Sequence, residues 1–185
     1  FQGSRGLGDV YKRQIKRGLL ERSDHAIFNA DDPDLRQQRQ SWTGGTWVSA
    51  ESAQPDGQPA DLWINGEGWV CDRSQPLFPA EALAMPGAHN RQNLLLATAA
   101  ALQIGLSPAS IEAGLRSFPG VPHRLEPLGR IGNAQVFNDS KATNYDAAAV
   151  GLKAMQGPVV VLAGGSTKQG DATGWLEELN RKACA

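Results

Sequence analysis

The sequence is poor in cysteine, in long apolar runs and in any excess of charge of one sign. Its two cysteines, Cys71 and Cys184, lie far apart and form no CxxC pair, which argues against a disulfide framework and a zinc site. No apolar run approaches the roughly 18 residues of a membrane span, and no signal-peptide core follows the basic residues near the start. With 18 Lys and Arg against 19 Asp and Glu, the net charge of −1 gives little attraction to nucleic acid or an anionic membrane.

The composition that remains is that of a globular protein. Hydrophobic residues make up 41% of the 185 residues and charged residues 20%, so the chain can bury a core as one domain or as parts of two. The first residues, 1–14, lack an initiating Met and read as linker sequence joined near Ile15, so we expect the fold to begin after them. The last residues carry no turn or cap signal. We therefore expect a fragment of a longer protein.

The first half of the chain predicts strands and then helices. Residues 26–33 predict a short buried strand stopped by an Asx/Pro turn. Residues 41–79 alternate tryptophans with Thr, Val and Ile between Gly-rich turns, which predicts a meander of antiparallel strands. We interpret the tryptophans as packing residues, with a carbohydrate-stacking surface as the alternative. Residues 90–104 predict a buried helix whose apolar stripe is Leu94, Ala97, Ala101 and Ile104, with Gly105 as its stop.

A second helix and a hinge separate this part from the next. Ser107-Pro108 predicts a helix start, and the helix ends before Pro119-Gly120. Residues 121–127 carry two prolines and predict a domain hinge. Beyond it the pattern is βαβα: a strand at 134–138, a helix at 145–155, an apolar strand at 158–163 and a helix from about Thr173. The fold class is therefore α/β, with a parallel sheet covered on both faces.

The clearest candidate site is the polar segment 138–144, between the end of a strand and the start of a helix. Ligands of α/β proteins bind at this edge, and a helix start attracts anions. Capping and Asx turns explain Asn138, Asp139 and Asn144 without a ligand, but they do not explain Lys141 at a helix start. The Gly-rich loop 164–170 with Lys168 repeats this chemistry, although it is not a Walker A motif.

Two further segments hold weaker candidates. Asn90 and Asn93 lie three residues apart on one helix face, and their amides suit either a nucleobase edge or the capping of that helix. Arg124 in the hinge could clamp a phosphate or ribose, or pair with Glu126. The remaining histidines of this region, His89 and His123, lack metal-ligand spacing.

Three segments in this order resemble the Mur ligase family: GAHNRQN (87–93), GVPHRLE (120–126) and NDSKATN (138–144). The run VVVLAGGSTK (159–168) strengthens the resemblance, and NADDP (29–33) adds a less specific match. The resemblance covers the chain from about Ile15 onward. Within the family, NDSKATN and VVVLAGGSTK are most similar to the ligases that add D-glutamate.

The resemblance implies a three-domain, cytoplasmic, monomeric enzyme of peptidoglycan synthesis. Residues 15–122 would be the later part of a central ATP-binding domain, and residues 123–185 the first half of a Rossmann-like carboxyl-terminal domain. The implied reaction uses ATP and Mg²⁺ to convert the carboxylate of UDP-N-acetylmuramoyl-L-alanine to an acyl phosphate, which the amine of D-glutamate attacks. The implied Mg²⁺ ligands lie outside this chain, so no residue here is assigned to a metal.

The resemblance also implies roles for individual residues. Asn90 and Asn93 would meet adenine, and Arg124 and Asp139 the ribose and phosphates of ATP. Lys141 would be the catalytic cation near the phosphates. The residues expected on the amino-acid substrate are Ser140, Thr143 and Lys168.

One departure from the family pattern changes what we expect of this chain. It contains no GxxGK[ST] phosphate loop, so we expect the polypeptide to be inactive by itself even if its parent is a ligase. Two alternatives stay open: another Mur or a folylpolyglutamate synthetase-like ligase, and a non-catalytic nucleotide-binding module. Amino-acid selectivity would separate the ligases from one another, and catalysis would separate them from the module.

Overall fold

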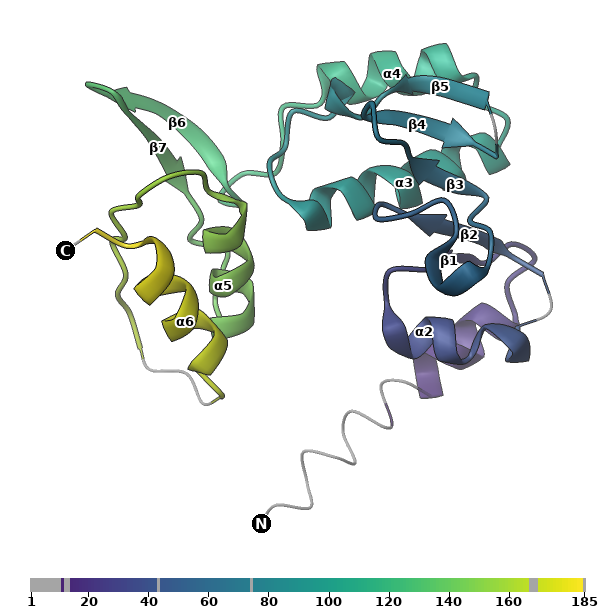
Figure 1. Ribbon diagram of the computed structural model, residues 1–185, viewed down its shortest axis with the longest axis horizontal. Helices are drawn as coiled ribbons and strands as arrows, with labels where there is room; N and C mark the ends of the chain where they lie inside the picture. Colours follow the sequence, from purple (N-terminus) through teal and green to yellow (C-terminus); the bar gives the residue numbers. More distant parts are fainter. Residues whose placement is uncertain (1–10, 12–13, 43, 74, 167–169, 185) are drawn as a thin grey trace. The chain divides into compact units, whose positions relative to one another are not determined.

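The structure is a computed structural model that describes residue 11 and residues 14–42, 44–73, 75–166 and 170–184 (Figure 1). It divides into two compact units. One comprises the chain up to Leu77 together with Leu95–Pro108, and the other comprises Phe78–Leu94 together with the chain from Ala109 onward. Helices and strands are mixed, so the α/β class is confirmed. No helix among these residues is long and apolar enough to cross a membrane.

A five-stranded sheet with the order β1-β2-β3-β4-β5 contains the early strands. β1 and β2 are parallel, β2 and β3 are parallel, and only then does β4 run antiparallel to β3. The predicted antiparallel meander is therefore wrong for β2 and β3, and right for the hairpin of β3 and β4. The strands are β1 (Ile27–Asn29), β2 (Thr46–Ser49), β3 (Leu62–Ile64), β4 (Trp69–Asp72) and β5 (Gln75–Pro79).

The Gly-rich segments around Gly45 and around Asn65 have different structural roles. Asn65 accepts the amide of Trp69 on its side chain (2.9 Å) and its carbonyl accepts from Gly68 (2.9 Å), which closes the predicted hairpin turn. Gly45 instead has φ +99° and lies against the ring of Phe28, where a Cβ would come within 2.5 Å of a ring carbon. Gly45 therefore permits close packing at the start of a parallel strand and does not form a hairpin.

Aromatic packing stabilises the β1–β2 pair. Phe28 stacks on Trp47 with ring centroids 4.6 Å apart and contacts Trp42 at 5.0 Å. Trp47 is buried, so the packing interpretation is confirmed for this tryptophan, whereas Trp69 is exposed. Asp32 caps the short helix α2 (Pro33–Gln37) by accepting the Leu35 amide, as the Asx/Pro turn predicted. Short 3₁₀ helices complete this part: η1 (Arg39–Ser41), η2 (Pro55–Gly57) and η3 (Ala80–Ala82).

Two longer helices follow, α3 (Ala88–Gln103) and α4 (Pro108–Ser117). Gly105 stops α3 as predicted: its φ is +85° and its amide bonds to Leu102 O. The predicted stripe is right at Leu94, which is buried, and wrong at Ala97, which is exposed, and at Ile104, which is 78% exposed. The buried positions of α3 are Asn90, Leu94, Leu95, Thr98 and Ala99.

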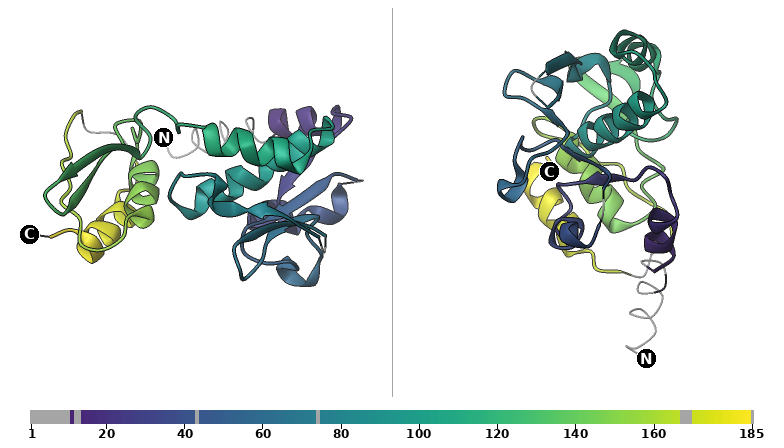
Figure 2. Two further views of the ribbon diagram at one scale, coloured as in Figure 1. Left: turned by 90° about the horizontal axis from the view of Figure 1, so that it is seen from above. Right: turned by 90° about the vertical axis from the view of Figure 1, so that its right-hand side faces the viewer.

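The last part of the chain consists of a hairpin and two helices. β6 (Glu126–Ile131) pairs antiparallel with β7 (Ala134–Asn138). α5 (Tyr145–Ala154) and α6 (Thr173–Lys182) lie side by side, as both views of Figure 2 show. The predicted strand at 134–138 and both helices are confirmed.

The predicted strand at 158–163 is wrong. Among the described residues this segment makes a single bridge, Val159 to Ala183, and no parallel ladder with β7. Val160 is 77% exposed and Leu162 97% exposed. An apolar run becomes a strand only beside a hydrogen-bonding partner, and β7 pairs with β6 instead, which the sequence pattern did not predict.

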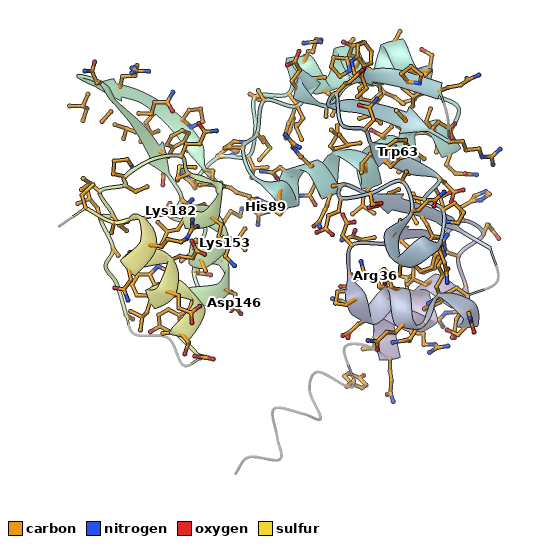
Figure 3. All side chains as sticks on the ribbon, in the orientation of Figure 1. Arg36, Trp63, His89, Asp146, Lys153 and Lys182 are labelled. Carbon is orange, nitrogen blue, oxygen red and sulfur yellow. The ribbon has the colours of Figure 1, made fainter. Side chains whose placement is uncertain are left out.

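Lys182 joins the ends of the two helices (Figure 3). Its ammonium donates to the carbonyls of Leu152 (2.8 Å), Lys153 (2.8 Å) and Met155 (2.5 Å) at the end of α5. The last carbonyls of a helix have no partner within the helix and carry partial negative charge. Lys182 therefore fixes α6 against the carboxyl-terminal end of α5.

Candidate functional site

The turn at residues 123–125 leads into β6 and contains Arg124. His123 has φ +64° and Leu125 has φ +44°, so two non-glycine residues adopt the left-handed conformation on either side of Arg124. This conformation is disfavoured for residues with a Cβ and persists only where other contacts hold it. The backbone around Arg124 is therefore a special conformation that its surroundings must stabilise.

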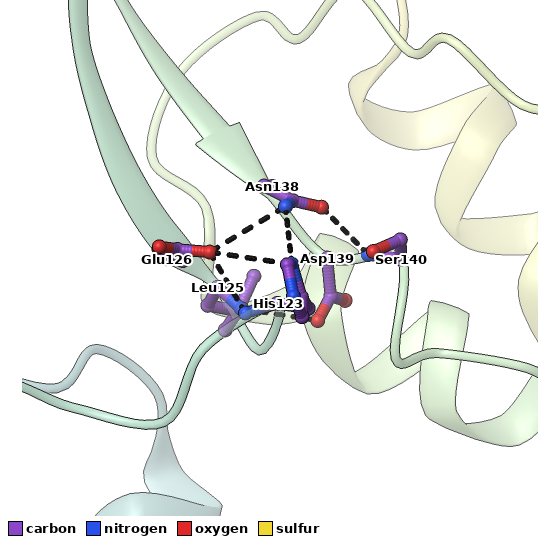
Figure 4. Close-up of polar contacts among 6 residues, drawn as sticks. All are labelled: His123, Leu125, Glu126, Asn138, Asp139 and Ser140. Carbon is purple, nitrogen blue, oxygen red and sulfur yellow. Dashed lines mark hydrogen bonds and ion pairs between the residues drawn. The ribbon is translucent and has the colours of Figure 1, made fainter.

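Two carboxylates hold the turn through its amides (Figure 4). The His123 amide donates to Glu126 Oε2 at 2.8 Å, and the Leu125 amide donates to Asp139 Oδ1 at 3.1 Å. The carbonyl of His123 accepts the amide of Lys141 at 3.0 Å. The turn is thus tied to the polar segment 138–144. Arg124 lies between the two turn residues that are bonded to Asp139 and Lys141.

Asn138 adds a third set of contacts at the end of β7. Its Nδ2 lies 2.9 Å from His123 Nδ1 and 3.4 Å from Glu126 Oε2, while its Oδ1 accepts the Ser140 amide at 3.1 Å. The Ser140 bond is the expected Asx turn. Asn138 therefore both shapes its own loop and supports the His123 turn.

The segment from Lys141 to Asn144 leads into α5. Asn144 caps the helix by accepting the Ala147 amide at 2.8 Å. Lys141 and Thr143 are exposed, and no described residue forms an ion pair with the Lys141 ammonium. Lys141 lies three residues before this cap, and an unpaired cation on a loop that leads into a helix suits an anionic ligand. Lys168, the corresponding cation of the next loop, lies outside the described residues.

Asp139 is positioned by close packing as well as by its hydrogen bond. A Cβ built on Gly151, in the middle of α5, would collide with Asp139 Oδ2. Gly151 therefore allows the Asp139 carboxylate to approach the helix and receive the Leu125 amide. Sequence analysis missed Gly151, although a glycine inside an otherwise good helix was the available signal.

In the first turn of α3, the side chain of Asn90 is held by a carbonyl and a neighbouring side chain, which is not the backbone-amide contact of a helix cap. Its side chain is only 2% exposed, its Nδ2 donates to Pro86 O at 2.7 Å, and its Oδ1 accepts from Asn93 Nδ2 at 3.3 Å. Both of its amide groups are therefore engaged within the protein. Asn93 is exposed.

His89, beside Asn90, has an altered ionisation. Burial lowers the pKa of its imidazole, the positive charge of Arg124 lowers it further, and Asp139 partly opposes them. His89, Arg124 and Asp139 all belong to the second unit. A lowered pKa keeps the imidazole neutral at pH 7 and avoids a second cation beside Arg124.

A cavity of about 270 Å³ within the second unit is lined by Arg124 and Glu126 among mostly apolar groups. Few polar groups in an apolar lining is the common pattern of small-molecule sites. Sequence analysis named Arg124 as a site residue but missed the apolar lining, which comes from three separated segments. That lining includes Met85, Phe118, Val121 and Phe137.

Metal coordination finds no support in the residues placed by the structure. Within that part of the chain, no group of three or more His, Cys, Asp or Glu side chains lies close enough together to hold a metal ion. Cys71 is buried, and burial together with the nearby Glu67 raises the pKa of its thiol. The described site therefore consists of cations, amides and carboxylates around one turn and one helix start.

These features define an α/β protein with a polar, lysine-bearing loop between the end of β7 and the start of α5. No family model matches the chain. It is 96% identical over 180 residues to the UDP-N-acetylmuramoylalanine–D-glutamate ligase of Parasynechococcus marenigrum (strain WH8102), covering 97% of this chain and 39% of that protein. It is 72% identical over 173 residues to the ligase of the same name from Synechococcus sp. (strain CC9605), covering 94% of this chain and 38% of that protein.

A third relative of the same name, from Prochlorococcus marinus (strain MIT 9313), is 64% identical over 180 residues, 97% of this chain and 39% of its own length. The resemblance to the Mur ligase family, and within it to the D-glutamate-adding ligases, is confirmed. The chain spans less than two-fifths of the length of these curated relatives.

Proposed function

We propose that this chain forms part of an ATP-dependent ligase that joins D-glutamate to UDP-N-acetylmuramoyl-L-alanine in peptidoglycan synthesis. The observation that carries the proposal is the 96% identity across 97% of the chain to a ligase of that name. The exposed Lys141 on the loop that leads into α5 supports it, because such a reaction handles phosphates and carboxylates throughout.

The domain organisation is part of the proposal. We infer that residues 15–122 are the later part of a central ATP-binding domain, and that residues 123–185 are the first half of a Rossmann-like carboxyl-terminal domain. The parallel strands β1 to β3 are consistent with the first, and the packed helices α5 and α6 with the second. In this scheme residues 121–127 connect the domains and carry Arg124.

The residues present fit part of an ATP site. Arg124 lines a largely apolar cavity, which suits a nucleotide with a flat base and a charged tail, and the cation of Lys141 suits its phosphates. Asn93 offers an exposed side-chain amide for adenine, whereas Asn90 would act mainly by orienting the Asn93 amide. ATP, when bound with Mg²⁺, supplies the phosphoryl group that activates the substrate carboxylate as an acyl phosphate; we assign the metal's ligands to sequence outside this chain.

In this proposal, the chain's own residues bind and orient the nucleotide and the amino-acid substrate. Lys141 places positive charge where negative charge accumulates, and Arg124 and Asp139 fix the ribose and phosphate region. Ser140, Thr143 and Lys168 are proposed to hold the amino-acid substrate, whose carboxylates need hydroxyl and ammonium donors. Such a ligation depends on positioning and electrostatic stabilisation more than on covalent chemistry by the protein.

We further propose a cytoplasmic, monomeric parent enzyme that contacts neither nucleic acid nor membrane, in keeping with the net charge of −1. The chain by itself is proposed to be inactive, because no GxxGK[ST] loop occurs in its sequence. The implied partners are its two small-molecule substrates.

A graft tests the proposal. This chain's sequence replaces the matched segment in the full-length Parasynechococcus marenigrum relative, and ADP release is measured with UDP-N-acetylmuramoyl-L-alanine and one amino acid at a time. We expect turnover with D-glutamate and none with L-glutamate, L-lysine or meso-diaminopimelate. Turnover with another of these amino acids would indicate a different ligase, and absence of turnover would favour a non-catalytic nucleotide-binding module.

A further inference from the structure

Glu126 makes the shortest of the hydrogen bonds that hold the Arg124 turn, although it has no assigned contact with a ligand. Its Oε2 accepts the His123 amide at 2.8 Å and lies 3.6 Å from His123 Nδ1 and 3.4 Å from Asn138 Nδ2. One carboxylate oxygen is thus shared by three nitrogens of two residues. Glu126 itself begins β6, so a rigid element presents this oxygen to the turn.

The turn needs such support because of its backbone. His123 at φ +64° and Leu125 at φ +44° are in a region that side chains disfavour, and each has its amide bonded to a carboxylate. Asp139 holds the Leu125 side of Arg124, and Glu126 holds the His123 side. Released from either carboxylate, the turn would relax toward ordinary negative φ values and the base of the Arg124 side chain would move.

We propose that Glu126 is a positioning residue for Arg124: it fixes the left-handed turn from which the guanidinium reaches the ligand, and Asn138 orients its carboxylate. This inference rests on the proposed function, since it makes Arg124 a ligand-binding group. Glu126 does not touch the ligand in this account. The positioning role requires an acceptor oxygen at residue 126, because the group that Glu126 binds is the backbone N–H of His123.

The chemistry separates two substitutions at this position. Glu126→Gln keeps an acceptor oxygen at the same reach, so the turn should persist without the negative charge. Glu126→Ala removes the acceptor and leaves the His123 amide without it. His123→Gly offers a third handle, because glycine adopts positive φ without strain and needs the carboxylate less.

The first measurement is hydrogen exchange of the backbone amides in the 185-residue chain. We expect Glu126→Ala to speed exchange of the His123 and Leu125 amides by about tenfold, as the loss of a charged hydrogen bond would. Glu126→Gln should leave both amides close to wild type. The control is Glu112→Ala, which removes a half-buried glutamate that pairs with Arg116 on α4. Equal exchange in Glu126→Ala and wild type would overturn the holding role.

The second measurement uses the grafted ligase and separates KM for ATP from kcat. We expect Glu126→Ala to raise KM by about tenfold with kcat changed little, and Glu126→Gln to restore the wild-type KM. The effect of Glu126→Ala should shrink in the His123→Gly background. A fall in kcat alone, or failure of Glu126→Gln to rescue, would overturn positioning of Arg124. If the wild-type graft shows no ligation, the proposed function fails, while the exchange experiment still decides whether Glu126 holds the turn.

Discussion

Replacing Gly151 with alanine should destabilise the protein, which is the opposite of what a glycine inside a helix usually predicts. Gly151 lies in the body of α5, where alanine normally gains about 1 kcal/mol of helix stability over glycine. Here the added Cβ would collide with Asp139 Oδ2 and approach Leu125 Cδ2 to 3.6 Å. The Asp139 carboxylate must therefore move away from α5.

The size of the effect follows from what Asp139 holds. Moving its carboxylate breaks the 3.1 Å bond from the Leu125 amide, a hydrogen bond to a charged group. Such bonds contribute about 1.5–3 kcal/mol. Subtracting the helix gain of about 1 kcal/mol leaves a net loss of roughly 0.5–2 kcal/mol in the free energy of unfolding.

Gly114 is the matched control, because it lies inside α4 with no atom within 4 Å of a built Cβ. We expect Gly114→Ala to stabilise the chain by roughly 0.5–1 kcal/mol and Gly151→Ala to destabilise it, both measured by urea unfolding. Stabilisation by both substitutions to the same extent would refute the packing of Asp139 against α5.

Three further predictions concern ionisation, thiol reactivity and helix packing. Burial and the nearby Arg124 guanidinium lower the pKa of His89, so the unfolded chain binds a proton at this imidazole more readily than the folded chain. The free energy of unfolding should therefore fall as the pH drops below about 6.5. His89→Gln should reduce this fall, as measured by urea unfolding at pH 7.5 and pH 5.5. Iodoacetamide should label the exposed Cys184 and not the buried Cys71, whose raised pKa also keeps it protonated as a thiol. Mass spectrometry of the labelled native protein measures this, and labelling of Cys71 would contradict its burial. Lys182→Met should lower the free energy of unfolding by about 1–3 kcal/mol through three lost carbonyl contacts, whereas Lys153→Met on exposed surface should change it by under about 0.5 kcal/mol.

Elements that depend on local chemistry were predictable from the sequence. Gly105 ends α3, Asp32 and Asn144 cap their helices, and Asn65 closes a hairpin, each through bonds to backbone a few residues away. Such signals are contained within one short segment. The same holds for the polar loop at 138–144, whose Asx turn and helix cap formed as expected.

Features that depend on distant partners were not predictable. Residues 158–163 have the composition of a buried strand, but β7 pairs with β6 and leaves Leu162 exposed. β2 and β3 are parallel, which depends on how the loop between them crosses the sheet and not on their alternation. Apolar residues, many of them small alanines, occur on every face of α3, so the sequence pattern does not predict that Leu95 and Ala99 are on the buried face.

The candidate site shows the same division. Its cations and amides are visible as residue types, whereas the left-handed turn around Arg124 depends on carboxylates from Glu126 and Asp139, the latter 14 residues further along than the amide it accepts. Nothing in the residues of the turn itself signals this conformation, since neither His123 nor Leu125 is a glycine. The role of Gly151 likewise appears only once α5 packs against Asp139.

The most direct test of the account is D-glutamate-dependent ADP release by the grafted ligase, compared between Lys141→Met and Lys153→Met. Both substitutions remove one exposed lysine, but only Lys141 lies on the loop between β7 and α5, where its amide donates to the His123 carbonyl of the Arg124 turn. The account predicts that Lys141→Met lowers kcat by about 100-fold or more while Lys153→Met stays near wild type. Equal activity of the two variants would show that the loop at 138–144 is not the site of the reaction.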